Sequence, residues 1–316
     1  MKMLVMAMWP ESYLAQVREA FPGVTFVSTN DPATALREVA DADAIFGQPG
    51  REVILAGKQL KWIQSPSAGV EWMWNTPELP QLDIVVTNMR GAHAATIAEH
   101  FFAMMLFMTR QFPVLIEGQR QRQWVRPVEP PPVGLSGRTL GVLGLGNIGR
   151  AIAQRGKGFD MRVIAVDINE VEQPPYVDEL YRLDGLQYML SQADFQAIAI
   201  PITPESRGMI GAAQLEVMKP TAYLGIMSRG KIVDEQALIG ALKENMLAGL
   251  GADVMAIEPL PEDDPLWDAP RTILSPHMSG QSEQTSTRAT DILKENLRRF
   301  LAGEELYNTV VKARGY

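Results

Sequence analysis

The chain has 316 residues, 29 basic and 37 acidic side chains, a formal net charge of −8 and no cysteine. This length suggests about two domains. An acidic chain repels phosphate backbones, so we expect no nucleic-acid partner. The absence of cysteine excludes disulfides, thiolate metal sites and a cysteine nucleophile, and we expect no metal centre.

The apolar segments are too short to be a signal peptide or a membrane-spanning helix. The first, Met1–Met8, ends at Trp9-Pro10-Glu11, earlier than a signal peptide allows. Another, Phe101–Met108, falls far below the roughly 20 residues that span a bilayer. We therefore expect a soluble, cytoplasmic protein with no membrane partner.

Short apolar runs rich in branched residues alternate with amphipathic segments along the chain. The first predicted strands are Lys2–Met8, Val24–Ser28, Ala44–Phe46, Trp62–Gln64 and Ile84–Val86. A later group comprises Thr139–Leu145, Arg162–Asp167, Ala197–Ile200, Ala222–Ile226, Leu250–Val254 and Thr272–Leu274. Strand–helix alternation predicts parallel sheets with helices on both faces.

The segments between these strands indicate helices and one break. We predict helices over Ala92–Met108, Val233–Asn245 and Ser282–Leu301. Residues 119–137 are polar and then rich in proline, which disfavours a helix and predicts an exposed arm.

The strongest local motif is a glycine-rich turn after the predicted strand Thr139–Leu145. Gly144, Gly146 and Gly149 form G-x-G-x-x-G, and a helical pattern follows. In a dinucleotide-binding turn, these glycines allow a tight bend, approach of the pyrophosphate and close helix packing. The amides of Asn147 and Ile148 then face the phosphates at the helix start.

An acid at the end of the next predicted strand completes this motif. Asp167 is placed to accept hydrogen bonds from the adenosine ribose hydroxyls. Because a carboxylate there repels a 2′-phosphate, the sequence predicts NAD rather than NADP.

Three further polar residues each follow a predicted strand of the same group. They are Arg229, Glu258 and His277. Ligands bind at the carboxyl ends of parallel strands, so this is where an active site would be assembled.

These segments resemble the D-isomer-specific 2-hydroxyacid dehydrogenase family over nearly the whole chain. That family includes glyoxylate and hydroxypyruvate reductases, D-lactate dehydrogenases and phosphoglycerate dehydrogenases. The markers are Ser67–Val70, Ala98–His100, Gly144–Gly149 with Asp167, Ile200–Pro204, Ser228–Gly230, Asp253 with Glu258-Pro259, and Pro276-His277. The segments Pro276–Gly280 and Asn308–Tyr316 are similar to the glyoxylate/hydroxypyruvate reductase-like branch.

The resemblance implies an α/β fold of two doubly wound parallel-sheet domains, Rossmann-like and flavodoxin-like, with a cleft between them. We assign residues 1–98 plus 284–316 to a substrate (catalytic) domain. Residues 99–283 form the expected NAD-binding Rossmann domain.

Catalytic roles also follow from the resemblance. His277 would be the general acid in reduction and the base in oxidation. Glu258 would hydrogen-bond His277 and favour the imidazolium. Arg229 would clamp the substrate carboxylate and polarise the carbonyl.

Binding roles are carried over in the same way. The backbone around Ala68, Gly69 and Val70 would bind the other side of the substrate carboxylate. Asp253 would lie near the nicotinamide ring, and the loop with Pro201 and Thr203 would line the cofactor.

The resulting hypothesis is NAD(H)-dependent interconversion of a small 2-oxo acid and its D-2-hydroxy acid. The substrate class is glyoxylate, hydroxypyruvate or pyruvate, and the arm and the apolar helix suggest a homodimer. Two alternatives stay open: an NAD-sensing co-repressor-like binding protein, and a phosphite-type dehydrogenase.

Several residues depart from the pattern or have structural interpretations. Ile226 stands where many members have Asn. His93 is expected to be structural, and His100 to be a helix contact between domains. Trp72 and Trp74 are expected to pack rather than to shape the substrate pocket.

Overall fold

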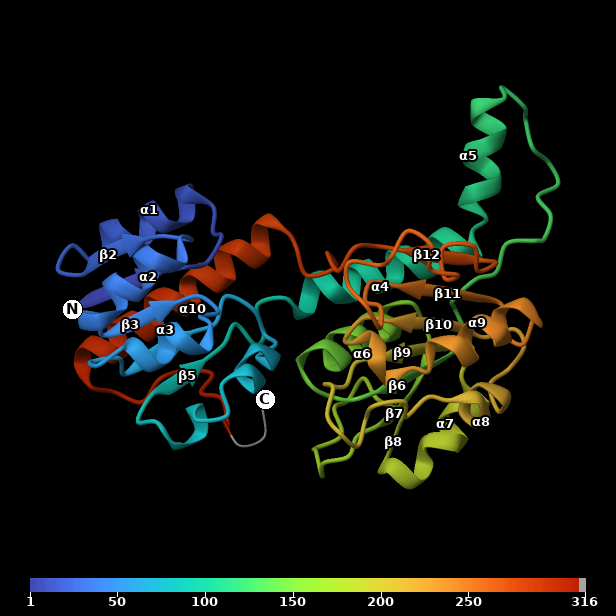
Figure 1. The fold of residues 1–316 in the computed structure, drawn as a ribbon. Helices are drawn as coiled ribbons and strands as arrows, with labels where there is room; N and C mark the ends of the chain where they lie inside the picture. The colour runs from blue at the N-terminus through green and yellow to red at the C-terminus, as the bar shows by residue number, and fades with distance from the viewer. Residues whose placement is uncertain (313–316) are drawn as a thin grey trace. The chain divides into compact units, whose positions relative to one another are not determined.

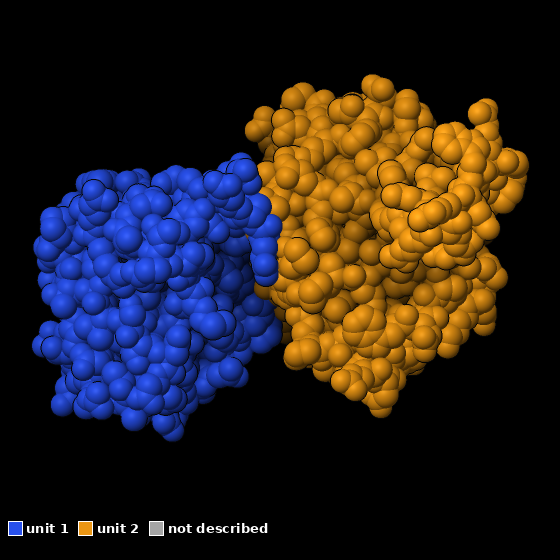
Figure 2. Space-filling model, turned by 90° about the horizontal axis from the view of Figure 1, so that it is seen from above, with its two compact units in different colours: residues 1–93, 281–316 blue, residues 94–280 orange. Residues whose placement is uncertain are grey.

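The computed structural model describes residues 1–312 and divides the chain into two compact units, coloured separately in Figure 2. Unit 1 comprises residues 1–93 and the chain from Gln281 onward, and unit 2 comprises Ala94–Gly280. The two domain boundaries expected from the sequence, 98/99 and 283/284, each lie a few residues further along the chain than the observed ones. The segment Asn308–Tyr316, which resembles the reductase branch, extends past residue 312 and so lies partly outside the described residues.

Unit 1 is built on a five-stranded parallel sheet. Its strands are β1 (Lys2–Val5), β2 (Thr25–Ser28), β3 (Ala44–Phe46), β4 (Trp62–Gln64) and β5 (Val85–Thr87). They are arranged in the order β2-β1-β3-β4-β5. This is the flavodoxin-like order, in which the connections wind to both sides of the first strand.

The helices of unit 1 cover both faces of this sheet (Figure 1). They are α1 (Glu11–Ala20), α2 (Pro32–Glu38), α3 (Arg51–Ala56) and α10 (Glu283–Ala302). The helix α10 contributes Ala289, Leu293 and Leu297 to the same buried cluster as Met3 and Val5 of β1. The last long helix therefore completes the core of the unit that begins the chain.

Unit 2 is built on a seven-stranded parallel sheet. Its strands are β6 (Thr139–Leu143), β7 (Arg162–Val166), β8 (Glu179–Tyr181), β9 (Phe195–Ile198), β10 (Tyr223–Ile226), β11 (Gly249–Ala252) and β12 (Thr272–Leu274). Their order is β12-β11-β10-β9-β6-β7-β8. Both units are thus doubly wound α/β folds, as predicted.

The helices of unit 2 pack on its sheet, with one exception. They are α4 (Ala94–Thr109), α5 (Phe112–Arg120), α6 (Asn147–Gly158), α7 (Leu186–Gln192), α8 (Ala212–Glu216) and α9 (Glu235–Lys243). The apolar helix α4 lies against the sheet, where Phe101 occupies the space left by Gly225 of β10. In contrast, α5 projects away from the sheet (Figure 1).

The structure corrects three details of the sequence prediction. Strand β8 was missed because its three residues are polar or half-buried. The expected arm begins later, since Gln119 and Arg120 still belong to α5. Several strands end sooner, because apolar residues such as Leu145 and Val254 stay buried beyond the last ladder pair.

Within residues 1–312, no helix combines the length and the hydrophobicity needed to cross a bilayer.

Candidate active site

The candidate site residues of unit 2 follow six of its seven strands, all at one edge of the sheet. The glycine loop follows β6, Asp167 follows β7, and the Pro201–Thr203 loop follows β9. Arg229, Asp253 with Glu258, and His277 follow β10, β11 and β12. Because the strands are parallel, their carboxyl ends share this edge, where α/β sheets bind ligands.

The backbone of the glycine loop fits a nucleotide phosphate. Gly144 has a φ of +96°, which side-chain-bearing residues rarely adopt. A Cβ on Gly149 would lie 1.7 Å from the carbonyl oxygen of Gly144, so only glycine lets α6 begin so close to the loop. A Cβ on Gly146 would meet nothing within 4 Å, which leaves the approach to the amides of α6 open.

Asp167 is buried and already bonded to the loops on either side of it. One carboxylate oxygen accepts the Leu145 N–H at 2.8 Å, and the other accepts the Asn169 N–H at 2.8 Å. A carboxylate offers about four acceptor positions, so capacity is left for a ribose hydroxyl. The residue therefore shapes the glycine loop and also fits the predicted ribose contact.

The loop after β9 is stabilised by its own side chains. Ser206 Oγ donates to the Pro201 carbonyl at 2.8 Å and accepts the Thr203 N–H at 2.8 Å. These bonds hold Pro201 and Thr203 at the same edge as the glycine loop.

His277 and Glu258 are brought together across 19 residues of sequence. Nδ1 of His277 lies 2.7 Å from Oε2 of Glu258, and both side chains are partly exposed. An ionised carboxylate can only accept, so Nδ1 carries the hydrogen and Nε2 faces outward from the pair. This arrangement can stabilise an imidazolium and can deliver a proton from Nε2.

The backbone of His277 lies in the left-handed region, with a φ of +50°. Such a conformation is costly for a residue other than glycine and needs support from its surroundings. Asp253, which is fully buried, supplies it: its carboxylate accepts the N–H groups of Met278 and Ser279, each at 2.9 Å. Its carbonyl also accepts the His277 N–H at 2.8 Å.

Arg229 lies on a turn that packs tightly against the segment leading to Glu258. Its Nη1 donates to the Ser228 carbonyl at 2.7 Å. A Cβ on Gly230 would lie 2.1 Å from the carbonyl carbon of Met255, so the two backbones touch. The turns bearing the arginine and the glutamate are therefore neighbours, on adjacent strands.

In unit 1, the Ser67–Val70 loop follows β4 and is held by side chains. Ser67 Oγ donates to the Gly69 carbonyl at 2.7 Å, and Asn88 Nδ2 donates to the Ala68 carbonyl at 2.8 Å. These bonds fix the carbonyls of the loop, and backbone amide N–H groups are the donors that an anion requires.

The remaining histidines and tryptophans occupy different environments. Burial lowers the pKa of His93, which favours its neutral form. His100 Nε2 lies 2.9 Å from Ser275 Oγ, a residue of the same unit, so this contact differs from the one expected between domains. Trp72 packs on the core of unit 1, whereas Trp74 is half exposed.

Three polar side chains support this edge in ways that the sequence pattern does not indicate: Ser275, Glu235 and the buried Asp253. Ser275 Oγ donates to the Asp253 carboxylate, and Glu235 accepts the Ala256 N–H. Asp234-Glu235 could be recognised as a helix start, because Asp234 caps α9 through the Ala237 N–H. Nothing in the local pattern indicates that the next side chain reaches Ala256.

Comparison with known proteins agrees with this architecture. The profile described as "D-isomer specific 2-hydroxyacid dehydrogenase, NAD binding domain" matches residues 102–279. A glyoxylate reductase of Korarchaeum cryptofilum is 34% identical, covering 93% of this chain and 91% of its own. A glyoxylate/hydroxypyruvate reductase B of Pectobacterium carotovorum is 31% identical, covering 90% and 89%.

A solved structure covers both units. It is a D-isomer specific 2-hydroxyacid dehydrogenase family protein of Aeromonas salmonicida, 31% identical, with a TM-score of 0.89 over 98% of each chain. The chain belongs to the D-isomer specific 2-hydroxyacid dehydrogenase family. It is an oxidoreductase of the D-2-hydroxyacid dehydrogenase type, which uses a nicotinamide cofactor and acts on a small hydroxy acid.

Proposed function

We propose that this protein reduces a small 2-oxo acid of the glyoxylate, hydroxypyruvate and pyruvate class to its D-2-hydroxy acid with NADH, or catalyses the reverse reaction. The observation that carries the proposal is the 2.7 Å pair between His277 Nδ1 and Glu258 Oε2. This pair lies beside the Arg229 turn, at the sheet edge that also bears the nucleotide loop.

Substrate binding is assigned to one cation and one amide loop. The planar guanidinium of Arg229 pairs with the substrate carboxylate and polarises the adjacent carbonyl. The amides around Ala68, Gly69 and Val70 of unit 1 are the further donors that we assign to the substrate carboxylate. Truncating Arg229 to alanine should therefore raise KM and lower kcat together.

The proton step is assigned to His277. Its Nε2 donates to the carbonyl oxygen as negative charge develops there, while Glu258 stabilises the imidazolium. A reduced nicotinamide, when bound, would supply the hydride to C2. In the oxidative direction the same Nε2 removes the hydroxyl proton, so one residue serves both directions.

Cofactor binding is assigned to the loops of β6, β7, β9 and β11. The residues are Gly144, Gly146, Asn147, Ile148, Gly149, Asp167, Pro201, Thr203 and Asp253. We infer that NADH is preferred over NADPH, because the Asp167 carboxylate would lie where a 2′-phosphate has to fit.

We also propose a homodimer in which the segment from α5 to Val133 binds a second copy. Trp124 is 92% exposed, and Phe112 of α5 is 44% exposed. Exposed aromatic residues on a projecting helix and on the segment that follows it are typical of a surface covered by a partner. Light scattering should give twice the chain mass, and a monomeric mass for the intact protein would contradict the proposal.

The deciding experiment is a panel of glyoxylate, hydroxypyruvate and pyruvate, each assayed with NADH and with NADPH by loss of reduced-nicotinamide absorbance. We expect turnover with at least one acid and a clear preference for NADH. A chain that binds NADH but turns over none of the acids would favour the binding-protein alternative. Reduction of NAD by phosphite, with no turnover of the 2-oxo acids, would favour a phosphite-type dehydrogenase.

A further inference from the structure

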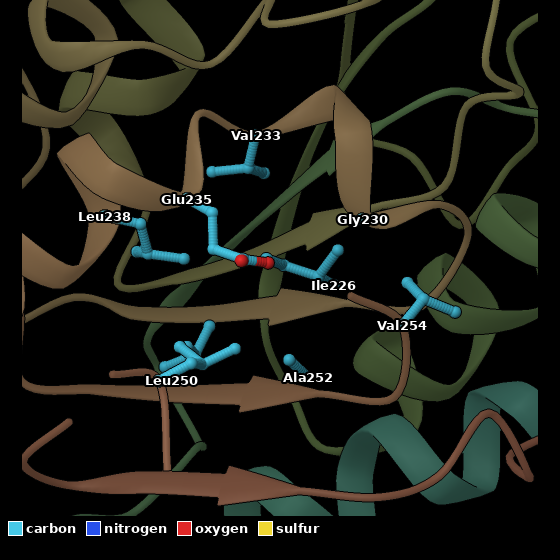
Figure 3. A pocket seen from close by; sticks show the side chains of 9 residues that line it. Ile226, Gly230, Val233, Glu235, Leu238, Leu250, Ala252 and Val254 are labelled. Carbon is cyan, nitrogen blue, oxygen red and sulfur yellow. The ribbon is translucent and has the colours of Figure 1, made fainter. Parts of the chain in front are cut away.

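Glu235 is an acidic side chain that none of the roles above uses. It follows the N-cap Asp234 as the first residue of α9. Its side chain points from the helix start into the space between α9 and the strands that carry Ile226 and Leu250 (Figure 3). There its Oε2 accepts the N–H of Ala256 at 3.0 Å, from a loop 21 residues further along the chain.

Glu235 is partly buried, and the side chains that surround its inner end are apolar. A cavity of about 10 Å³ is lined by Glu235 and by Ile226, Gly230, Val233, Leu238, Leu250, Ala252, Val254 and Leu266. A space of this size holds no more than about one water molecule, so it is not a substrate site. A carboxylate among apolar side chains is costly unless it is hydrogen-bonded, and the Ala256 amide provides that bond.

The loop that Glu235 holds leads directly to Glu258. Glu258 Oε1 accepts the Met255 N–H at 3.0 Å, while its Oε2 pairs with His277. On its other side, this segment touches Gly230, where a Cβ would come within 2.6 Å of the Ala256 nitrogen. The backbone of residues 255–256 is therefore fixed by Glu235, by Glu258 itself and by the Arg229 turn.

We propose that Glu235 is a positioning residue for this reaction. Its hydrogen bond to Ala256 fixes the loop that directs Glu258 toward His277. The inference rests on the proposed function, in which the Glu258–His277 pair handles the proton. A purely structural role would have a different consequence. An acid in the first turn of α9 would stabilise the helix through its dipole, and its removal would leave the Glu258–His277 pair unaffected.

The first test compares three variants of the full-length protein by steady-state kinetics with the most active acid of the panel. Glu235→Ala removes the bond to Ala256, and we expect kcat to fall about tenfold, the effect of losing a charged hydrogen bond. Glu235→Gln keeps an acceptor oxygen and should retain most of the activity. Glu283→Ala is the matched control, because Glu283 is also the first residue after an N-cap but is exposed on α10.

A double-mutant cycle then separates positioning from general destabilisation. If Glu235 acts through Glu258, Glu235→Ala should change kcat by less than about twofold in a Glu258→Gln background. An undiminished tenfold loss in that background would overturn the proposal, as would full activity of Glu235→Ala.

An activity-independent readout distinguishes failure of this inference from failure of the proposed function. The chain has three histidines, so the ring ¹⁵N signals of His277 can be assigned with a His277→Gln variant. In Glu235→Ala we expect faster amide exchange at Ala256 and a mixture of His277 tautomers, with circular dichroism unchanged. If the wild type reduces no 2-oxo acid, the proposed function fails, and these spectra still decide the role of Glu235. Unchanged Ala256 exchange with an unchanged His277 ring would refute it.

Discussion

The two halves of the carboxyl edge of unit 2 are built by different means. On the side of β6, β7 and β9, the proposed nucleotide loop has glycines at two positions, Gly144 and Gly149, where a Cβ would collide, and a single carboxylate, Asp167, accepts one of its amides. On the side of β10, β11 and β12, the proposed catalytic turns are fixed mainly by carboxylates that accept backbone amides from distant loops. Asp253 and Glu235 each accept such an amide, whereas Glu258 accepts the N–H of Met255 within its own loop.

This difference implies that the halves respond differently to mutation. A methyl group added to a tightly packed glycine should disrupt the loop in one step, because the backbone around it has no room to move. A turn supported by hydrogen bonds loosens by degrees as each bond is removed. Cofactor binding and turnover should therefore be separable, and the following predictions test that, from the largest expected effect to the smallest.

Replacing His277 by glutamine should affect the catalytic half alone. We expect kcat to fall by about 10²–10⁴-fold, because the general acid is lost. The dissociation constant of NADH, measured by fluorescence titration, should stay the same. Unchanged turnover would show that His277 is not the proton donor.

Replacing Gly149 by alanine should damage the cofactor half. The added Cβ would lie 1.7 Å from the Gly144 carbonyl oxygen, so the loop or α6 has to shift. We expect NADH binding to weaken by more than about tenfold and the free energy of unfolding to fall by about 1–3 kcal/mol. Gly158→Ala is the control on the same helix, because a Cβ there meets nothing within 4 Å. Normal NADH affinity in Gly149→Ala would contradict the steric account.

Replacing Asp253 by asparagine should loosen the turn that bears His277. An amide nitrogen would face one of the two N–H groups that the carboxylate now accepts. We expect kcat to fall about tenfold, as for a lost hydrogen bond to a charged group. NADH affinity should fall less, reflecting the proposed location near the nicotinamide. A variant with wild-type kinetics would rule out both roles.

Replacing Asp167 by alanine should erode the preference for NADH over NADPH. The effect should be a change of about tenfold in the ratio of the two kcat/KM values, because a charged hydrogen bond to the ribose is lost and the repulsion of a 2′-phosphate disappears. Glu170→Ala, an exposed acid nearby, is the control for charge alone. If the wild-type protein prefers NADPH, Asp167 does not exclude the 2′-phosphate and the proposed role is wrong.

Sequence reasoning found most of the sheet and placed each candidate loop after a strand. The ranges Ala44–Phe46, Trp62–Gln64 and Thr272–Leu274 match the observed strands, since apolar composition and pairing end at the same residues. The predicted strands Thr139–Leu145 and Leu250–Val254 run too far, because Leu145 and Val254 are buried in the loops that follow the observed strands. The helix α5 was missed as a separate element, since a short helix that projects from its unit lacks a long apolar face.

The sequence by itself determined the fold class, the glycine loop and the candidate catalytic side chains, because glycine spacing and strand periodicity are local properties. Only the tertiary structure decided that Asp253 supports the strained His277 turn and that Glu235 reaches Ala256. Those partners lie 21 or more residues apart and meet through the order of β10, β11 and β12, which no local pattern encodes.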